Sequence, residues 1–357
     1  MNVESNSDHE PATTPRQETA PALLYTAPRQ AEIREVPLGE GEALLAMEVS
    51  ALSRGTERLV FEGRVPQSEH ARMRAPFQTG EFPFPVKYGY CAVARVEEGP
   101  AGWRGRLVFA LHPHQARFRL PLSALTPLPE GLPSGRAALA ANMETALNVT
   151  WDAGVGPGDR VAVIGAGLVG CLVARLCARI PGTEVILCDR IPSRQAAADA
   201  LGVKFTSSQG EFPQPFAGFE GGDDDAGEGA RSGACDVAIN TSASAGGLAA
   251  AISLLGPEGR VVEASWHGAG ETPVPLGGAF HSRRLSIVSS QVGRLPPARA
   301  PRWDHGRRMQ AALRLLAEDP ALDALISAEV AFADLPARLP ALLAPEAEGI
   351  ATLVRYP

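Results

Sequence analysis

A glycine-rich turn between an apolar strand and a helix constrains this chain more than any other stretch. Residues 161–164 read Val-Ala-Val-Ile, which is typical of a buried strand, and Gly165, Gly167 and Gly170 follow directly. In a dinucleotide-binding unit the first such glycine permits a tight turn and the second lets a pyrophosphate approach the backbone, while the third lets the helix pack closely on the strand. The stretch therefore predicts a phosphate-binding turn that leads into a helix N-terminus.

The residues after the turn extend this pattern into a βαβ unit. Residues 171–180 carry a helical pattern, and Leu168 and Val169 are expected in the phosphate-binding turn before it. A second apolar strand ends in Asp189, which lies 189 − 165 = 24 residues after the first glycine. An acid about 20 residues beyond that glycine binds the adenosine ribose in such units. The alternative is a glycine-rich turn in an ordinary α/β domain, with Asp189 merely solvated.

The acid also indicates which nicotinamide cofactor is preferred. Asp189 should accept hydrogen bonds from the ribose hydroxyls and repel a 2′-phosphate, so we expect NAD(H). Arg190 and Arg194 lie close behind the acid, and a guanidinium group can bind a phosphate, so we expect NADP(H) to be tolerated. Thr241 and Trp266 follow two later predicted strands, and both are expected to contribute to the cofactor site.

Composition and charge exclude several other classes of protein. The chain has 357 residues, enough for two domains, and its net charge of −7 argues against nucleic-acid binding. No apolar run is long enough to span a membrane, and the N-terminus lacks the apolar core of a secretion signal. The five cysteines show no metal-ligand spacing and are expected to be reduced core residues. We therefore expect a cytoplasmic protein that acts on a small molecule.

The rest of the chain separates into segments of different character. Residues 1–20 are rich in Ser, Thr, Pro and Glu and are predicted to form a disordered tail. Short apolar runs between Pro and Gly turns then predict an antiparallel, barrel-like domain through residue 135. Residues 136–284 alternate strands with helices, which indicates a parallel sheet. Within them, residues 209–233 are predicted to be a solvated acidic loop, with a metal site at Asp223–Asp225 as the less favoured alternative.

This order of segments resembles the medium-chain dehydrogenase/reductase superfamily of the zinc alcohol dehydrogenase type. The likeness rests on the barrel-like domain, on residues 158–170 and on the apolar strand at 351–355; residues 53–57 and 87–90 are most similar to the branch containing bacteriochlorophyllide dehydrogenase. The resemblance implies an α/β fold with a GroES-like β-barrel catalytic domain and a Rossmann domain with a doubly wound parallel sheet. It implies that 21–135 and 285–357 form the former and 136–284 the latter. We also expect a homodimer.

The residues expected to bind zinc in that family are missing here. Either Arg54 or Ser53 stands at the position of the first cysteine ligand, depending on the alignment, and Tyr90 stands at the position of the histidine. The third ligand position falls near residues 140–144, where only Glu144 could ligate, and the four-cysteine structural lobe is absent. Cys91 could be argued as a substitute ligand. We expect no zinc.

Without zinc, other side chains must handle the substrate proton. By resemblance, Thr56 matches the family's proton-relaying hydroxyl, while Glu57 matches its acid behind the metal and could instead orient Arg54. Tyr90 could donate a proton. The structural alternatives are a turn cap for Thr56, an ion pair between Glu57 and Arg54, and a space-filling role for Tyr90. Three histidines are further candidates for a proton-transferring group near neutral pH: His112, His114 and His267.

Three functions remain compatible with these residues. The first is a zinc-independent, NAD(P)-dependent oxidoreductase that transfers hydride between nicotinamide and an alcohol or ketone. The second is an NAD(P)H-dependent reductase of activated C=C bonds in enones or quinones. The third is a nucleotide-binding protein without catalysis. In the first two cases we expect the candidate residues and the glycine-rich turn to face each other across a cleft.

Overall fold

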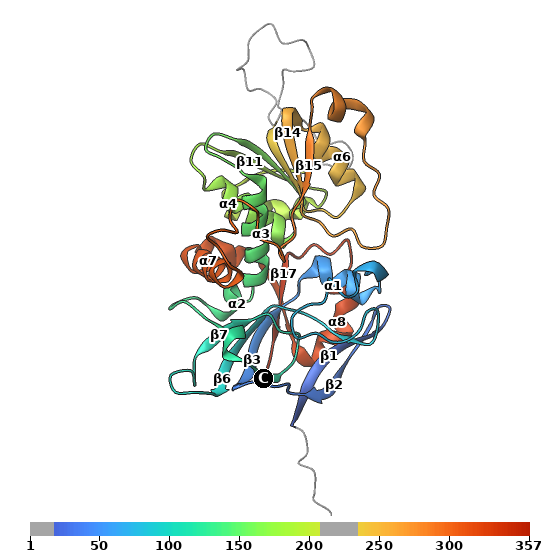
Figure 1. Ribbon diagram of the computed structural model, residues 1–357. Coiled ribbons are helices and arrows are strands. Elements are labelled where there is room, and N and C mark those ends of the chain that lie inside the picture. Colours follow the sequence, from blue (N-terminus) through green and yellow to red (C-terminus); the bar gives the residue numbers. More distant parts are fainter. Residues whose placement is uncertain (1–17, 208–234) are drawn as a thin grey trace, which may run out of the picture.

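A parallel sheet carries the glycine-rich turn. The computed structural model describes residues 18–207 and 235–357, so the predicted acidic loop at 209–233 and most of the predicted N-terminal tail lie outside it (Figure 1). The parallel sheet has six strands, in the order β12 (Lys204–Ser207), β11 (Glu184–Asp189), β10 (Arg160–Ile164), β13 (Cys235–Asn240), β14 (Leu255–Glu263) and β15 (Ser286–Ser289). This is the strand order 3-2-1-4-5-6 of the doubly wound dinucleotide-binding fold.

Alternating side chains on these strands are buried on opposite faces of the sheet. Val161 and Val163 of β10 join a core with helices α3 (Ala140–Ala153) and α4 (Leu168–Ala178), whereas Ala162 and Ile164 join another with α6 (Ala245–Ser253). Successive residues of a strand point to opposite faces, so the sheet is covered on both sides. This burial explains why β10 is apolar without interruption.

The other strands form two sheets from both ends of the chain. A four-stranded sheet has the order β2 (Gln30–Pro37), β1 (Thr19–Ala27), β5 (Val86–Lys87) and β4 (Thr79–Gly80). A second sheet has the order β16 (Ile326–Ala331), β17 (Ala351–Arg355), β3 (Ala43–Ala51), β6 (Ala92–Glu98), β7 (Leu107–Ala110) and β9 (Thr126–Pro127), with β8 (Arg117–Leu120) on β3. In the described part of the chain these strands do not close into one ring, so the predicted barrel is two adjoining sheets.

The structure corrects several predicted boundaries. Strand β1 begins at Thr19, inside the predicted tail, and β15 belongs to the parallel sheet although the domain boundary was expected at residue 285. Helix α1 (Arg54–Phe61) was not predicted from the sequence. Gly55 and Thr56 are poor helix formers. The helix is stabilised at its C-terminal end, where Leu59, Val60 and Phe61 are buried. Tertiary packing therefore decides this element.

The C-terminal segments return to the first sheets, as expected. Strand β17 pairs with β3, and α8 (Leu335–Leu342) packs against β2. Helix α7 (His305–Glu318) packs on α3 and on α2 (Ser134–Ala137), while α5 (Gln195–Ala200) covers β12. Figure 1 shows β17 running between the parallel sheet and the strands around the N-terminus. No helix in the described ranges is long and apolar enough to cross a membrane, and all five cysteines are buried and free.

Candidate functional site

A cleft of about 640 Å³ brings the predicted site residues together. It is lined by the glycine-rich turn and β11 from the parallel sheet, by the first turn of α1, and by residues of α3 and of the segment before β17. Every predicted cofactor residue and three of the four predicted catalytic residues line it: Gly165, Gly167, Leu168, Val169, Gly170, Asp189, Arg190, Arg194, Thr241, Trp266, Arg54, Thr56 and Tyr90. The exception is Glu57.

The three glycines of the turn meet different surroundings. Gly165 has φ +102°, which favours glycine, and a Cβ there would lie 2.9 Å from the Thr241 hydroxyl. A Cβ on Gly170 would lie only 1.8 Å from the carbonyl oxygen of Gly165, so helix α4 and β10 are in the closest contact. At Gly167 a Cβ would meet no protein atom within 4 Å. The first and third glycines are therefore required by the fold itself, while the second is not.

Helix α4 presents its N-terminus to the cleft. Gly167 is its N-cap residue, and no side chain caps the first turn. The N–H groups of the first turn have no partner within a helix, and they carry the positive end of the helix dipole. Thr241 supports the turn from below, because its hydroxyl donates to the carbonyl oxygens of Ile164 at 3.1 Å and Gly165 at 2.9 Å. The arrangement favours an anionic group above the turn.

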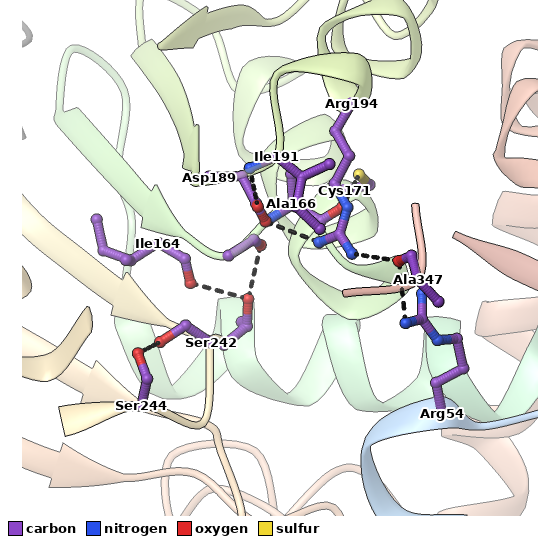
Figure 2. Close-up of polar contacts among 12 residues, drawn as sticks. Arg54, Ile164, Ala166, Cys171, Asp189, Ile191, Arg194, Ser242, Ser244 and Ala347 are labelled. Atoms are coloured by element: carbon purple, nitrogen blue, oxygen red, sulfur yellow. Dashed lines mark hydrogen bonds and ion pairs between the residues drawn. The ribbon is translucent and has the colours of Figure 1, made fainter. Parts of the chain in front are cut away.

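The carboxylate of Asp189 is held at the end of β11 by three donors (Figure 2). The backbone N–H of Ala166 donates to Oδ2 at 2.6 Å, and the N–H of Ile191 donates to Oδ1 at 2.9 Å. Arg194 forms an ion pair with Oδ2 at 2.8 Å. A carboxylate has about four lone-pair sites, so this one retains accepting capacity toward the cleft. Arg190, which was expected to act with Arg194, is exposed at the rim.

Arg54 joins α1 to the segment before β17. Its guanidinium donates to the carbonyl oxygens of Ala344 and Ala347, each at 3.1 Å, and to that of Gly349. Burial, followed by the charges of Arg194 and Arg58, lowers the pKa of Arg54 to about 10. Figure 2 shows that Arg194 reaches the same carbonyl oxygen of Ala347, at 3.4 Å. The expected ion pair between Arg54 and Glu57 is wrong, because helix α1 directs the two side chains to different partners.

Glu57 lies behind the cleft in a buried polar network. It accepts hydrogen bonds from the hydroxyl of Tyr25 and from the N–H of Ser53, both at 2.7 Å, and its Oε2 lies 3.1 Å from Nε2 of His114. Burial alone would raise the pKa of Glu57, but His114 and the three hydrogen bonds together hold it below its ordinary value. Glu57 therefore fixes the first turn of α1 and does not reach the cleft.

A cluster of neutral polar groups lies at the start of α1 and on α3. The hydroxyl of Tyr90 donates to Ser53 Oγ at 2.6 Å, and Asn142 Nδ2 donates to the same oxygen at 3.2 Å. Cys91 Sγ donates to Asn142 Oδ1 at 3.6 Å. Burial is the main cause that raises the pKa of both Tyr90 and Cys91 above their ordinary values. From the sequence, Ser53 was noted only as an alternative at the first ligand position, and Asn142 was not predicted; a polar amide in the Ala-rich start of α3 was its only local sign.

The zinc expected in this family does not fit the donors present. Ser53 and Tyr90 occupy positions that the resemblance pairs with ligands, and Asn142 lies within residues 140–144, near which the third position falls. Zinc prefers thiolate, imidazole and carboxylate to the hydroxyl, phenol and amide of these residues. Glu144 turns away to an ion pair with Arg308 at 3.0 Å, and the Cys91 thiol faces Asn142. Among residues 18–207 and 235–357, no group of three or more His, Cys, Asp or Glu is placed to hold a metal.

The histidines and Trp266 have different environments. Trp266 lines the cleft, whereas His267 is turned toward Thr272 at 3.1 Å and Glu263 at 3.5 Å. His112 is buried in a stack on Phe118, with ring centroids 3.8 Å apart. Neither histidine lines the cleft, and His114 is the partner of Glu57. Trp266 thus borders the cleft together with Ala264 and Ser265, which also follow β14.

Comparison with known proteins identifies the fold. No protein family model matches the chain. A stretch of 117 residues is 26% identical to an uncharacterized zinc-type alcohol dehydrogenase-like protein of Escherichia coli K12. This match covers 32% of the chain, which spans only 31% of the length of that relative.

Solved structures match over nearly the whole chain. A putative zinc-binding dehydrogenase from Sinorhizobium meliloti 1021 bound to NADP has a TM-score of 0.73 at 20% identity, covering 95% of this chain and 100% of that one. L-idonate 5-dehydrogenase from Escherichia coli K-12 has a TM-score of 0.72 at 14% identity, covering 94% and 98%. An alcohol dehydrogenase from Escherichia coli CFT073 in complex with NADH has a TM-score of 0.70 at 16% identity, covering 94% and 99%. The chain therefore has the fold of the zinc-type alcohol dehydrogenases, which confirms at the level of fold its resemblance to medium-chain dehydrogenases/reductases.

Proposed function

We propose that this chain is an NAD(P)-dependent oxidoreductase that works without zinc on an alcohol or ketone. The observation that carries the proposal is the single cleft that joins a phosphate-binding turn to a cluster of hydroxyl groups. The structural neighbours bound to NADP and NADH support a nicotinamide cofactor. Such a cofactor supplies or accepts the hydride, and the protein must bind it, orient the substrate and handle one proton.

The cleft has the features that a dinucleotide requires. Gly167 borders it, and a Cβ there would meet no protein atom within 4 Å, so the space above its backbone is open to a pyrophosphate. The N-terminus of α4 would take the pyrophosphate, and the remaining lone-pair site of Asp189 would accept from a ribose hydroxyl. We propose that Arg190 lies beside the adenosine end, because it borders the cleft next to Asp189.

We propose a preference for NAD(H) that is weaker than Asp189 alone would give. A lone carboxylate repels a 2′-phosphate, but Arg194 neutralises this one at 2.8 Å. If Arg194 turned from the carboxylate toward a phosphate, the site would accept NADP(H) through a charge-assisted hydrogen bond. Titration with both cofactors tests this preference, and tighter binding of NADPH than of NADH would contradict it.

We propose that the substrate oxygen binds beside Tyr90 and Thr56. Both border the cleft, and Thr56 lies close enough to Tyr90 to influence the pKa of its hydroxyl. Tyr90→Phe and Thr56→Val should each lower turnover by about 10-fold or more, because loss of a proton-transferring group costs 10²–10⁴ when that group acts alone. Cofactor affinity should change by less than about twofold. Full turnover by both variants would contradict the assignment.

Turnover assays separate this function from the two alternatives. The purified protein would be incubated with NADH or NADPH and with acetoin, cyclohexanone or cyclohex-2-enone, and the loss of absorbance followed. Reduction of the ketones supports the proposal, whereas reduction of the enone alone would favour C=C reduction. Cofactor binding without any turnover would favour a nucleotide-binding protein. The homodimer stays a prediction that the mass in solution tests.

We further propose that the parallel sheet binds the cofactor and that the other two sheets bind the substrate. The parallel sheet would form the dinucleotide-binding domain, with its boundary after β15 instead of at residue 285. The segments 21–135 and from α7 onward would form the substrate domain, because α1 and α8 pack with its strands. Expression of residues 136–289 alone, followed by NADH titration, tests whether cofactor binding belongs to that unit.

A further inference from the structure

We propose that Ser53 is the group that donates the proton to the substrate oxygen, and that Tyr90 and Asn142 hold it as a donor. This inference rests on the proposed ketone reduction. Ser53 borders the cleft, and it lies at the N-terminal end of helix α1, where its own N–H is tied to Glu57 at 2.7 Å. The backbone of Ser53 is therefore fixed, and its side chain has few positions available.

The hydrogen-bonding capacity of Ser53 Oγ determines the direction of its proton. A serine hydroxyl has two lone pairs and one proton. Tyr90 donates to this oxygen at 2.6 Å and Asn142 donates to it at 3.2 Å, so both lone pairs are used. Among the hydrogen bonds of the described residues, Ser53 Oγ has no other partner. The remaining Ser53 proton is then directed away from both donors and toward the cleft.

Cys91 fixes the orientation of the Asn142 amide. The two ends of an asparagine side chain are distinguished by their partners. Burial keeps the Cys91 thiol neutral by raising its pKa well above the ordinary value, so its sulfur carries a proton to donate. That thiol lies 3.6 Å from the end of Asn142 assigned as Oδ1, and a proton donor at this place favours the oxygen there. The NH₂ group faces Ser53 and cannot accept the serine proton.

A continuous set of hydroxyls can replace the proton that Ser53 gives up. Thr56 borders the cleft, and it lies close enough to Tyr90 to offset part of the rise that burial causes in the pKa of Tyr90. When a ketone is reduced, its carbonyl carbon receives the hydride and its oxygen takes the proton of Ser53. Ser53 takes the proton of Tyr90, Tyr90 that of Thr56, and Thr56 one from a solvent water, which leaves hydroxide. The cofactor that supplied the hydride would leave as NAD(P)⁺. The product is the alcohol, and the three residues return to their starting states.

The arrangement suits a neutral carbonyl oxygen and not a carboxylate. Ser53, Tyr90 and Asn142 carry no charge, and their hydrogen-bond directions are set before any ligand binds. A single inward-pointing donor matches a ketone oxygen that becomes an alkoxide. In this chain a fixed hydroxyl would thus serve as the acid at the position where the resembled family places its first zinc ligand.

Neutron diffraction tests the donor geometry without any substrate. Crystals of the full chain exchanged into D₂O should show the deuterons of Tyr90 and Asn142 directed at Ser53 Oγ and the Ser53 deuteron directed into the cleft. A Ser53 deuteron on the oxygen of Tyr90, or an Asn142 oxygen facing Ser53, would overturn the proposal. This result does not depend on whether the chain is an oxidoreductase.

Steady-state kinetics of variants test the proton transfer from Ser53 to the substrate oxygen. Ser53→Ala should lower kcat for acetoin or cyclohexanone by about 100-fold or more, in the range of a lost general acid, while the Kd for NADH stays within about twofold. Asn142→Asp should lower kcat similarly, because its carboxylate would accept the Ser53 proton. Ser53→Thr should retain a substantial part of kcat, and the exposed Ser253→Ala is the control for the same chemical change.

The pH dependence of kcat distinguishes a hydroxyl donor from a histidine donor, and the activity of the wild type tests the proposed function separately. Neutral hydroxyls predict a kcat that is nearly constant from about pH 6 to 9, whereas a histidine donor would make kcat fall above about pH 6.5. If the wild type reduces ketones and Ser53→Ala keeps full kcat, the role of Ser53 is overturned and the proposed function stands. If the wild type bound NADH but reduced no ketone, the proposed function would fail and the transfer step with it.

Discussion

Asp189 combines a structural and a recognition role in one carboxylate. It fixes the turn through Ala166 at 2.6 Å and is paired with Arg194 at 2.8 Å. Asp189→Ala should weaken NADH binding by about 10-fold, since hydrogen bonds to a charged group contribute about 1.5–3 kcal/mol, and should strengthen NADPH binding by freeing Arg194. Fluorescence titration of both cofactors measures this change. Asp199→Ala, an exposed acid on α5, is the control, and an unchanged ratio would mean that Asp189 does not face the ribose.

Glu57 makes stability depend on pH in the acid range. Because its folded pKa is lowered, its contribution is present above its unfolded pKa of about 4.3 and is lost as the pH falls through the lower folded value. Glu57→Gln should cost about 3 kcal/mol at pH 7, because it removes a buried carboxylate that accepts three hydrogen bonds. The difference from wild type should shrink below about pH 4. Chemical unfolding from pH 3 to 7 measures it, with the exposed Glu258→Gln as control.

At the scale of elements, two glycines of the turn before α4 have different roles, one in stability and one in cofactor binding. Gly170→Ala places a methyl group 1.8 Å from the Gly165 carbonyl oxygen and should destabilise the chain by about 3 kcal/mol, as overpacking does. Gly167→Ala meets no protein atom within 4 Å and should leave thermal stability nearly unchanged while abolishing NADH binding. Thermal unfolding and cofactor titration of both variants test this contrast. Equal loss of stability in the two would remove the argument for a ligand at Gly167.

The elements predictable from the sequence are those whose signal is local. Strand β10, the turn and Asp189 lie within 30 residues, and their apolar run and glycine spacing follow from local geometry. Helix α1 was not predictable, because Gly55 and Thr56 disfavour it and contacts with distant residues stabilise it. The meeting of Ser53 with Tyr90 and Asn142 joins positions 37 and 89 residues apart, which no local pattern encodes.

At the scale of the whole molecule, the donor set predicts how the protein responds to zinc. Elemental analysis of the purified chain should find far less than one zinc per chain after mild chelation, because a hydroxyl, a phenol and an amide bind zinc poorly. Ser53→Cys/Tyr90→His/Asn142→Cys should gain stoichiometric zinc if these positions share one ligand geometry. About one retained zinc in the wild type would contradict the zinc-free assignment.

The partners of Arg54 have a consequence for the order in which the molecule is made. Residues that border the cleft run from position 53 to position 350, and the carbonyls that hold Arg54 belong to residues 344–349. A ribosome releases α1 long before these carbonyls exist, so the growing chain carries an unfinished cleft for most of its synthesis. Only after residues 344–350 emerge can Arg54 and Arg194 share the oxygen of Ala347. The wall of the cleft opposite the glycine-rich turn would therefore be complete only in chains translated through residue 350, whereas the turn itself is made much earlier.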